Sequence, residues 1–110
     1  MFGSKLDKIG KMVEKNQAEK LEKLLKDKDQ NVVLAAIDGL GQCTGDVSFN
    51  ALVSLILSPD AQIRSHAVKA LGVMGLPKAR TFLLHLKEEE KDQSVLVALE
   101  EALKKISVKV

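Results

Sequence analysis

The sequence predicts an all-α fold of about three and a half stacked helical hairpins. Three similar stretches begin at Asp29, Asp60 and Asp92, which are almost equally spaced along the chain. Between them lies a second set of leucines, Leu21, Leu52 and Leu83, that repeats with the same spacing. Apolar residues in both kinds of segment recur at spacings of three, four and seven, which is typical of amphipathic helices. A period of about 30 residues in helical segments indicates a repeat array.

Each repeat is expected to hold a first helix, a turn and a second helix. First helices are predicted in "AEKLEKLLKDK", "FNALVSLILS" and "ARTFLLHLKEE", and each second helix follows one of the three Asp residues. Asp favours this position because its carboxylate accepts hydrogen bonds from the unpaired N–H groups of the first turn. Helix-breaking residues in "TGD", "SPD" and "GLPK" predict the turns. The third repeat is slightly longer than the others, and we expect the acidic run "KEEEKD" (87–92) to hold the insertion in a solvated loop.

The same period extends to the beginning of the sequence. Ile9 lies one period before Leu40, so that "IGKM" aligns with "LGQC" and "LGVM" in the later second helices. Residues 1–15 are therefore predicted to form a half-repeat that has only its second helix. Full repeats are predicted at 16–45, 46–76 and 77–110. A half-repeat at an end is a natural place for a solenoid to cap itself.

The apolar positions define a predicted core. In the second helices these positions are the third, seventh and eleventh residues after Asp, which share one side of a helix. Together with leucines of the first helices, the predicted core residues are Leu24, Leu40, Leu55, Ile63, Ala67, Leu71, Leu86, Val95, Leu99 and Leu103.

Composition favours a soluble, cytoplasmic protein. Hydrophobic residues make up 45% of the 110 residues and charged residues 29%, and the net charge is only +2. The apolar runs are far shorter than the roughly 20 residues needed to cross a bilayer. Cys43 is the one cysteine, so no internal disulfide can form and a reducing compartment is expected.

No residue pattern indicates catalysis, a cofactor or a metal site. His66 and His85 lie on different predicted helices and have no acid at triad-like spacing. Cys43 aligns with Met12 and Met74 in a column that we expect to be buried, where a thiol acts as a small hydrophobe. The acidic run lacks the glycine and the spaced oxygen ligands of a calcium loop. We therefore expect a non-enzymatic protein.

The N-terminal lysines raise nucleic-acid binding as an alternative. Residues 1–28 hold eight Lys against five acidic residues, and four of these lysines recur at helical spacing from Lys5 to Lys15. Nucleic-acid binding, however, relies largely on Arg contacts and aromatic stacking. The chain contains only two Arg, and its three Phe are its only aromatic residues. A solvated lysine-rich face is thus favoured over a weak nucleic-acid binder.

The stretch "PDAQIRSHAVKALGVMG" (59–75) resembles the consensus of HEAT-type repeats. It is similar to the short subtype first noted in phycobilisome-lyase subunits. The resemblance implies a right-handed superhelix whose second helices line the concave face. It also implies a scaffold or adaptor that binds another protein, as most members of the family do. An accessory subunit of an enzyme complex such as a bilin lyase is the alternative.

The resemblance also implies a ladder between repeats, made by the turn Asp and a consensus Arg. Only Arg64 keeps that Arg, since Val33 and Leu96 stand at the equivalent positions. We therefore expect a single rung, in which Arg64 reaches Asp29 or Asp60. A contact between Arg64 and a ligand is the alternative.

The implied concave face defines a candidate protein-binding surface. In each second helix, the fifth, ninth and thirteenth residues after Asp lie opposite the predicted core. Across the repeats they form three columns: Leu34, Ser65 and Val97; Asp38, Lys69 and Glu101; Gln42, Val73 and Lys105. Exposed apolar residues rimmed by charge favour a protein contact, in which Lys69 would set the orientation. A plain solvent face is the alternative.

The C-terminal stretch "SVLVALEEALKKISVKV" (94–110) carries apolar residues beyond those that the core needs, Leu96 and Val97 among them. A terminal repeat usually has a polar outer face. End-to-end dimerisation through residues 95–110 would bury this surplus and is a further hypothesis.

Overall fold

The computed structural model describes residues 4–106 of the chain, which form seven α-helices and one short 3-10 helix. The elements are α1 (Lys5–Glu14), α2 (Ala18–Leu24), α3 (Gln30–Gly41), α4 (Asp46–Leu55), α5 (Ala61–Met74), η1 (Pro77–Ala79), α6 (Arg80–Glu89) and α7 (Gln93–Ile106). The predicted all-α array of helical hairpins is confirmed in these residues.

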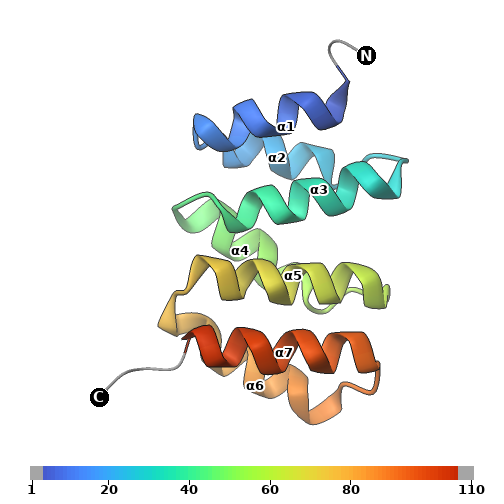
Figure 1. The fold of residues 1–110 in the computed structure, drawn as a ribbon, viewed down its shortest axis with the longest axis vertical. Helices are drawn as coiled ribbons and strands as arrows, with labels where there is room; N and C mark the ends of the chain where they lie inside the picture. Colours follow the sequence, from blue (N-terminus) through green and yellow to red (C-terminus); the bar gives the residue numbers. More distant parts are fainter. Residues whose placement is uncertain (1–3, 107–110) are drawn as a thin grey trace.

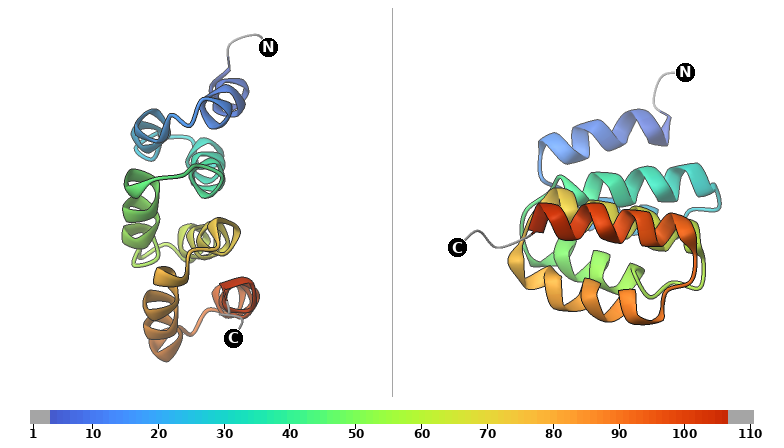
Figure 2. Two further views of the ribbon diagram at one scale, coloured as in Figure 1. Left: turned by 90° about the vertical axis from the view of Figure 1, so that its left-hand side faces the viewer. Right: turned by 60° about the horizontal axis from the view of Figure 1, so that its bottom comes forward.

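The helices form two layers. In Figure 1, α1, α3, α5 and α7 are stacked from the N-terminal to the C-terminal end, and α2, α4 and α6 lie behind them. Figure 2 shows the layers edge-on, with connections that pass back and forth between them. We call the layer of α1, α3, α5 and α7 the inner layer, because it lies on the concave side of a gentle curve. The layer of α2, α4 and α6 is the outer layer.

An Asp caps each of the last three inner helices, as the sequence predicts. A carboxylate oxygen of Asp29 accepts a hydrogen bond from the N–H of Asn31 at 2.9 Å, and Asp60 and Asp92 accept the equivalent bonds. The residue two positions before each Asp accepts a hydrogen bond from the N–H of that Asp; these residues are Asp27, Ser58 and Glu90. The three turns therefore share one hydrogen-bonded geometry although their sequences differ.

The core lies between the two layers. The predicted core residues that are buried are Leu40, Ala67, Leu71, Leu86, Val95 and Leu99. The four others are partly buried and pack against the core: Leu24, Leu55, Ile63 and Leu103. Leu24 and Leu55 are the last residues of α2 and α4.

Successive inner helices approach closely where a Gly faces an Ala. A Cβ atom added at Gly41 would lie 2.8 Å from the Cα of Ala70, and one added at Gly72 would lie 3.0 Å from the Cα of Ala102. Because close-packed backbone cannot yield at such distances, a side chain here would push the helices apart. Gly10 aligns with these glycines in α1, yet a Cβ added there would meet nothing within 4 Å.

The last inner helix, α7, has charged residues at positions that are buried in α3 and α5. At the eighth position after Asp, Ile37 and Val68 are buried, whereas Glu100 of α7 is exposed. At the twelfth position α3 and α5 have buried glycines, whereas α7 has the exposed Lys104. The free side of α7 therefore has the polar character of a terminal repeat.

Arg64 links two repeats through Glu90, a partner that the sequence did not predict. Its guanidinium donates two hydrogen bonds to the Glu90 carboxylate, both at 2.8 Å, and one to the backbone oxygen of Ser58 at 2.9 Å. The predicted rung with Asp29 or Asp60 is therefore wrong. Arg64 reaches forward to the turn before α7, while the two Asp residues cap their own helices.

The side chain of Glu90 is therefore not solvated, which corrects the prediction of a solvated loop at residues 87–92. This side chain is 4% exposed. Hydrogen bonds from Arg64 lower the pKa of the Glu90 carboxyl below its ordinary value, and the same contact raises the pKa of Arg64. The pair therefore stays ionised, because the two-pronged geometry stabilises both charges.

Similar links join the other turns along this edge of the array. Lys5 of α1 pairs with Asp27 in the turn before α3, and this hydrogen bond lowers the pKa of the Asp27 carboxyl. Gln30 of α3 donates a hydrogen bond to Asp60, the cap of α5, at 3.2 Å. A polar side chain of α1, α3 and α5 thus reaches forward to the turn that precedes the next inner helix.

Replacing Leu71 by Ala should lower the free energy of unfolding by about 2–5 kcal/mol, because this side chain is fully buried. Denaturant unfolding followed by far-ultraviolet circular dichroism measures the loss. Leu84→Ala, at an exposed position of α6, is the matched control and should cost less than about 1 kcal/mol. A loss below about half a kcal/mol at Leu71 would contradict its place in the core.

Gly41→Ala and Gly10→Ala should change stability in opposite directions. The first inserts a methyl group against the Ala70 backbone and should lower the free energy of unfolding by about 1–3 kcal/mol. The second inserts one into open space within α1 and should raise it by up to about 1 kcal/mol through helix propensity. The same unfolding measurement compares the two variants. Equal effects on the free energy of unfolding would show that the contact with Ala70 does not restrict the size of the side chain at residue 41.

Glu90→Gln should remove an acid-sensitive part of the stability. Since the folded state lowers the pKa of Glu90, it binds this proton less readily than the unfolded state. The stabilisation is therefore present above the ordinary pKa of about 4.5 and is lost as the pH falls below it. The variant should be less stable than the parent chain by about 1–3 kcal/mol at pH 7.

The measurement for Glu90 is the free energy of unfolding of both chains between pH 3 and 7. The difference between them should shrink toward zero at the acidic end. A difference that is independent of pH would mean that the charge of Glu90 does not stabilise the fold.

Candidate functional site

The inner layer exposes most of the residues predicted to bind a partner. The residues at the ninth and thirteenth positions after Asp are all exposed: Asp38, Gln42, Lys69, Val73, Glu101 and Lys105. They belong to α3, α5 and α7, which lie parallel and one repeat apart (Figure 1). Equivalent residues therefore form columns that run across the helices.

The fifth-position column is not a continuous exposed surface, which corrects the sequence prediction. Leu34 is 9% exposed and Ser65 is 6% exposed. The close approach of successive inner helices covers this position, so that only Val97 on the last helix is exposed. Leu34 and Ser65 therefore belong to the contact between repeats. The amphipathic pattern of a single helix could not predict this burial, because the pattern carries no information about where the next helix lies.

His66 bridges two repeats on the inner layer. Its Nδ1 atom lies 2.9 Å from a carboxylate oxygen of Asp38, so that α5 and α3 are joined by a hydrogen bond. The sequence pattern around His66 did not predict this pairing with Asp38. Because the two are far apart in the chain, only the stacking of repeats brings them together.

Lys69 lies between Asp38 and Glu101 in the ninth-position column. Among the described residues, it forms no ion pair with either acid. Asp38 is already engaged by His66, whereas Lys69 is exposed. The ammonium group of Lys69 is thus available to a negative group outside the chain.

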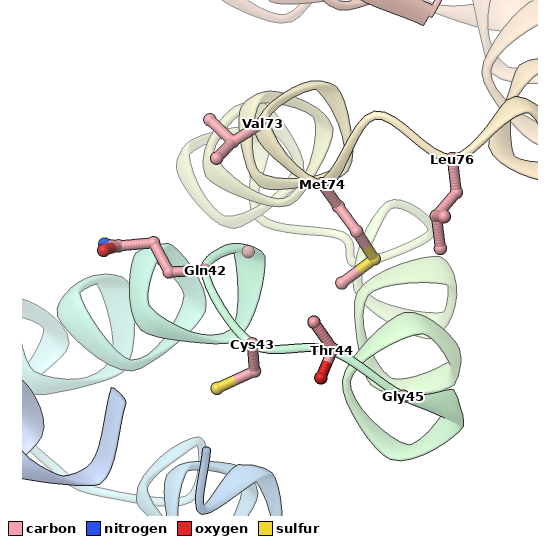
Figure 3. A pocket seen from close by; sticks show the side chains of 8 residues that line it. Gln42, Cys43, Thr44, Gly45, Val73, Met74 and Leu76 are labelled. Carbon is pink, nitrogen blue, oxygen red and sulfur yellow. The ribbon is translucent and has the colours of Figure 1, made fainter. Parts of the chain in front are cut away.

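A hollow of about 420 Å³ opens at the C-terminal ends of α3 and α5. Two of the predicted contact residues, Gln42 and Val73, line it together with Met74 and Leu76 (Figure 3). The side chain of Val73 is 57% exposed. This is the place where the structure brings predicted contact residues beside a concave, largely apolar surface.

Cys43 lies beside this hollow without contributing a reactive thiol. Its side chain is buried, and Figure 3 shows its sulfur pointing away from Val73 and Met74. Burial raises the pKa of the Cys43 thiol, which favours the protonated and less nucleophilic form. The residue therefore acts as part of the core.

Within residues 4–106, no group of three or more His, Cys, Asp or Glu side chains is arranged to hold a metal ion. His85 lies on α6 in the outer layer, 3.6 Å from Glu88 and on a different layer from His66. None of the helices described has both the length and the apolar character required to cross a bilayer.

An apolar groove on the outer layer was not predicted from the sequence. It lies between α4 and α6 and is lined by Val53, Ile56, Leu57, Thr81, Phe82 and His85. Leu57 and Phe82 are exposed there. A signal was present in the sequence, because residues 47–59 contain no charged side chain.

The model of the family described as HEAT repeats matches residues 9–104. No curated protein matches the sequence significantly. The family match spans every inner helix at least in part and all of the outer layer, in agreement with the stacked hairpins, the capped turns and the close Gly–Ala contacts. The chain therefore belongs to the HEAT-repeat family.

Proposed function

We propose that the chain is a non-enzymatic scaffold that binds another protein across its inner layer. HEAT repeats commonly mediate protein–protein interactions, which supports a protein as the partner. The observation that carries the proposal is the exposed Val73 beside the apolar hollow at the ends of α3 and α5. An exposed apolar side chain next to a hollow offers an anchor for a side chain of a partner.

Charge defines the partner segment further. Lys69 precedes Val73 by one helical turn on α5, so both side chains lie on the same side of that helix. A partner that inserts an apolar side chain beside Val73 would bring a neighbouring acidic side chain to Lys69. The apolar contact would supply affinity, and the ion pair would select the orientation and reject basic partners.

Two narrower roles rest on the resemblance or on the lysine pattern alone. An accessory subunit of an enzyme complex, such as a bilin lyase, is a special case of a scaffold and is supported only by the resemblance to the short HEAT subtype. Nucleic-acid binding through the N-terminal lysines is disfavoured, because Lys5 is engaged by Asp27. A cytoplasmic location, suggested by the single buried Cys43, is part of the main proposal.

End-to-end dimerisation through the C-terminal helix remains a prediction, and residues 107–110 of that stretch lie outside the described residues. The exposed Glu100 and Lys104 argue against it, since an inner helix stacked on α7 in the usual way would bury both charges.

Lys69→Glu combined with Val73→Asp should reduce capture of the partner at least tenfold while the fold is kept, because both side chains are exposed. The measurement is a native pull-down with the intact chain as bait, quantified by mass spectrometry. Far-ultraviolet circular dichroism and thermal unfolding establish that the variant is folded.

Lys15→Glu combined with Glu19→Lys is the matched control, since it also changes two exposed residues but lies away from α5. It should capture the same partners as the parent chain. A folded Lys69 and Val73 variant that still captures every partner of the parent chain would place the binding site elsewhere.

A further inference from the structure

The outer layer contains an apolar groove that the proposed function does not use. The groove between α4 and α6 has a volume of about 340 Å³. Leu57, just after α4, is 70% exposed, and Phe82 of α6 is 45% exposed. Two large apolar side chains that flank one groove on the surface are a typical feature of a contact site.

The surface around the groove also lacks charge on the α4 side. Residues 47–59 contain no charged side chain, although charged residues make up 29% of the sequence. The exposed residues of α4 in this segment are Asn50 and Ser54. The centre of a protein interface is typically depleted of charge and enriched in aromatic residues. The α4 side of the groove and Phe82 have this composition.

Charge appears in a definite order along α6. Lys78, Phe82, His85 and Glu88 follow one another at helical spacings of four and then three positions, which places them along one side of η1 and α6. Lys78 and Glu88 are both more than half exposed. Each also lies 3.6 Å from an exposed partner within the chain, Lys78 from Asp46 and Glu88 from His85. Exposed pairs of this kind are weak, so both charges can still pair with a second molecule. The stripe therefore begins with a positive charge, continues through the exposed Phe82 and ends with a negative charge.

This order of charges selects the occupant of the groove. We propose that a second copy of the chain docks on the outer layer, so that two α6 helices lie antiparallel across a two-fold axis near Phe82. In this arrangement Lys78 of each copy faces Glu88 of the other, and the charge-free surfaces meet between them. A parallel arrangement would place like charges together.

The antiparallel arrangement is favourable in two further respects. It opposes the dipoles of the two α6 helices, which places each positive N-terminal end near a negative C-terminal end. It also satisfies the requirement that a two-fold interface be self-complementary. The outer layer belongs to the broad face of a molecule that measures 44 × 30 × 19 Å, and a standard interface takes about 800 Å² from each partner.

Analytical ultracentrifugation of the full chain tests whether it dimerises. The parent chain should show a dimer fraction that rises with concentration up to about 1 mM. Leu57→Asp should raise the dissociation constant of the dimer at least tenfold, because it places a charge in the apolar contact. Leu6→Asp is the matched control at another exposed leucine, on α1, and should leave the constant unchanged within about threefold.

A charge exchange tests the arrangement of the two copies. Glu88→Lys and Lys78→Glu should each weaken the dimer several-fold, since each brings two like charges together twice in the dimer. The double variant carrying both changes should recover the dissociation constant of the parent chain within about threefold. Because Lys78 also contacts Asp46 and the ring of Phe49, thermal unfolding must show that each variant is folded.

Three results would overturn the proposal. The first is a parent chain that stays monomeric at about 1 mM, and the second is a dimer that Leu57→Asp leaves intact. The third is a double charge exchange that fails to restore association. A dimer abolished by Val97→Asp instead would assign the interface to α7. The Lys69 and Val73 variant should dimerise normally, so this proposal and the proposed function are tested separately.

Discussion

Each inner helix packs closely on the next, and the exposure of most other residues follows from this contact. It is set where Gly41 meets Ala70 and where Gly72 meets Ala102, at distances that leave no space for a larger side chain. These contacts fix the step from α3 to α5 and from α5 to α7. They also decide which residues of each inner helix are covered: Leu34 and Ser65 are buried by the next repeat, while Lys69 and Val73 remain on the surface.

The polar links along the turns follow from this fixed step. Lys5, Gln30 and Arg64 differ in chemistry, yet each reaches the turn that precedes the next inner helix. What the repeats share is therefore the distance between a helix and the following turn, which several long polar side chains can span. Arg64 and Glu90 are the most deeply buried of these pairs, and a buried pair must have good hydrogen-bond geometry because desolvation of both charges is costly.

Stacking also determines which surfaces remain for partners. A hairpin that is covered on both sides by its neighbours leaves only the inner and the outer layer exposed. The two layers differ in character. The inner layer combines charged columns with an apolar hollow, whereas the outer layer has a charge-free apolar groove around Leu57 and Phe82. One chain can therefore present two distinct contact surfaces.

Local sequence patterns were sufficient to predict the helices, the capped turns, the repeat period and the buried positions of Leu40, Leu71 and Leu99. These features depend on the local periodicity of apolar residues and on hydrogen bonds within a few residues of each turn. The burial of Leu34, the partner of Arg64 and the contact of His66 with Asp38 could not be predicted from such patterns and follow from the stacking of the repeats. Each joins residues from different repeats, so it depends on the distance and angle between helices. A single helix pattern does not contain that geometry, because it is set by the Gly–Ala contacts between repeats.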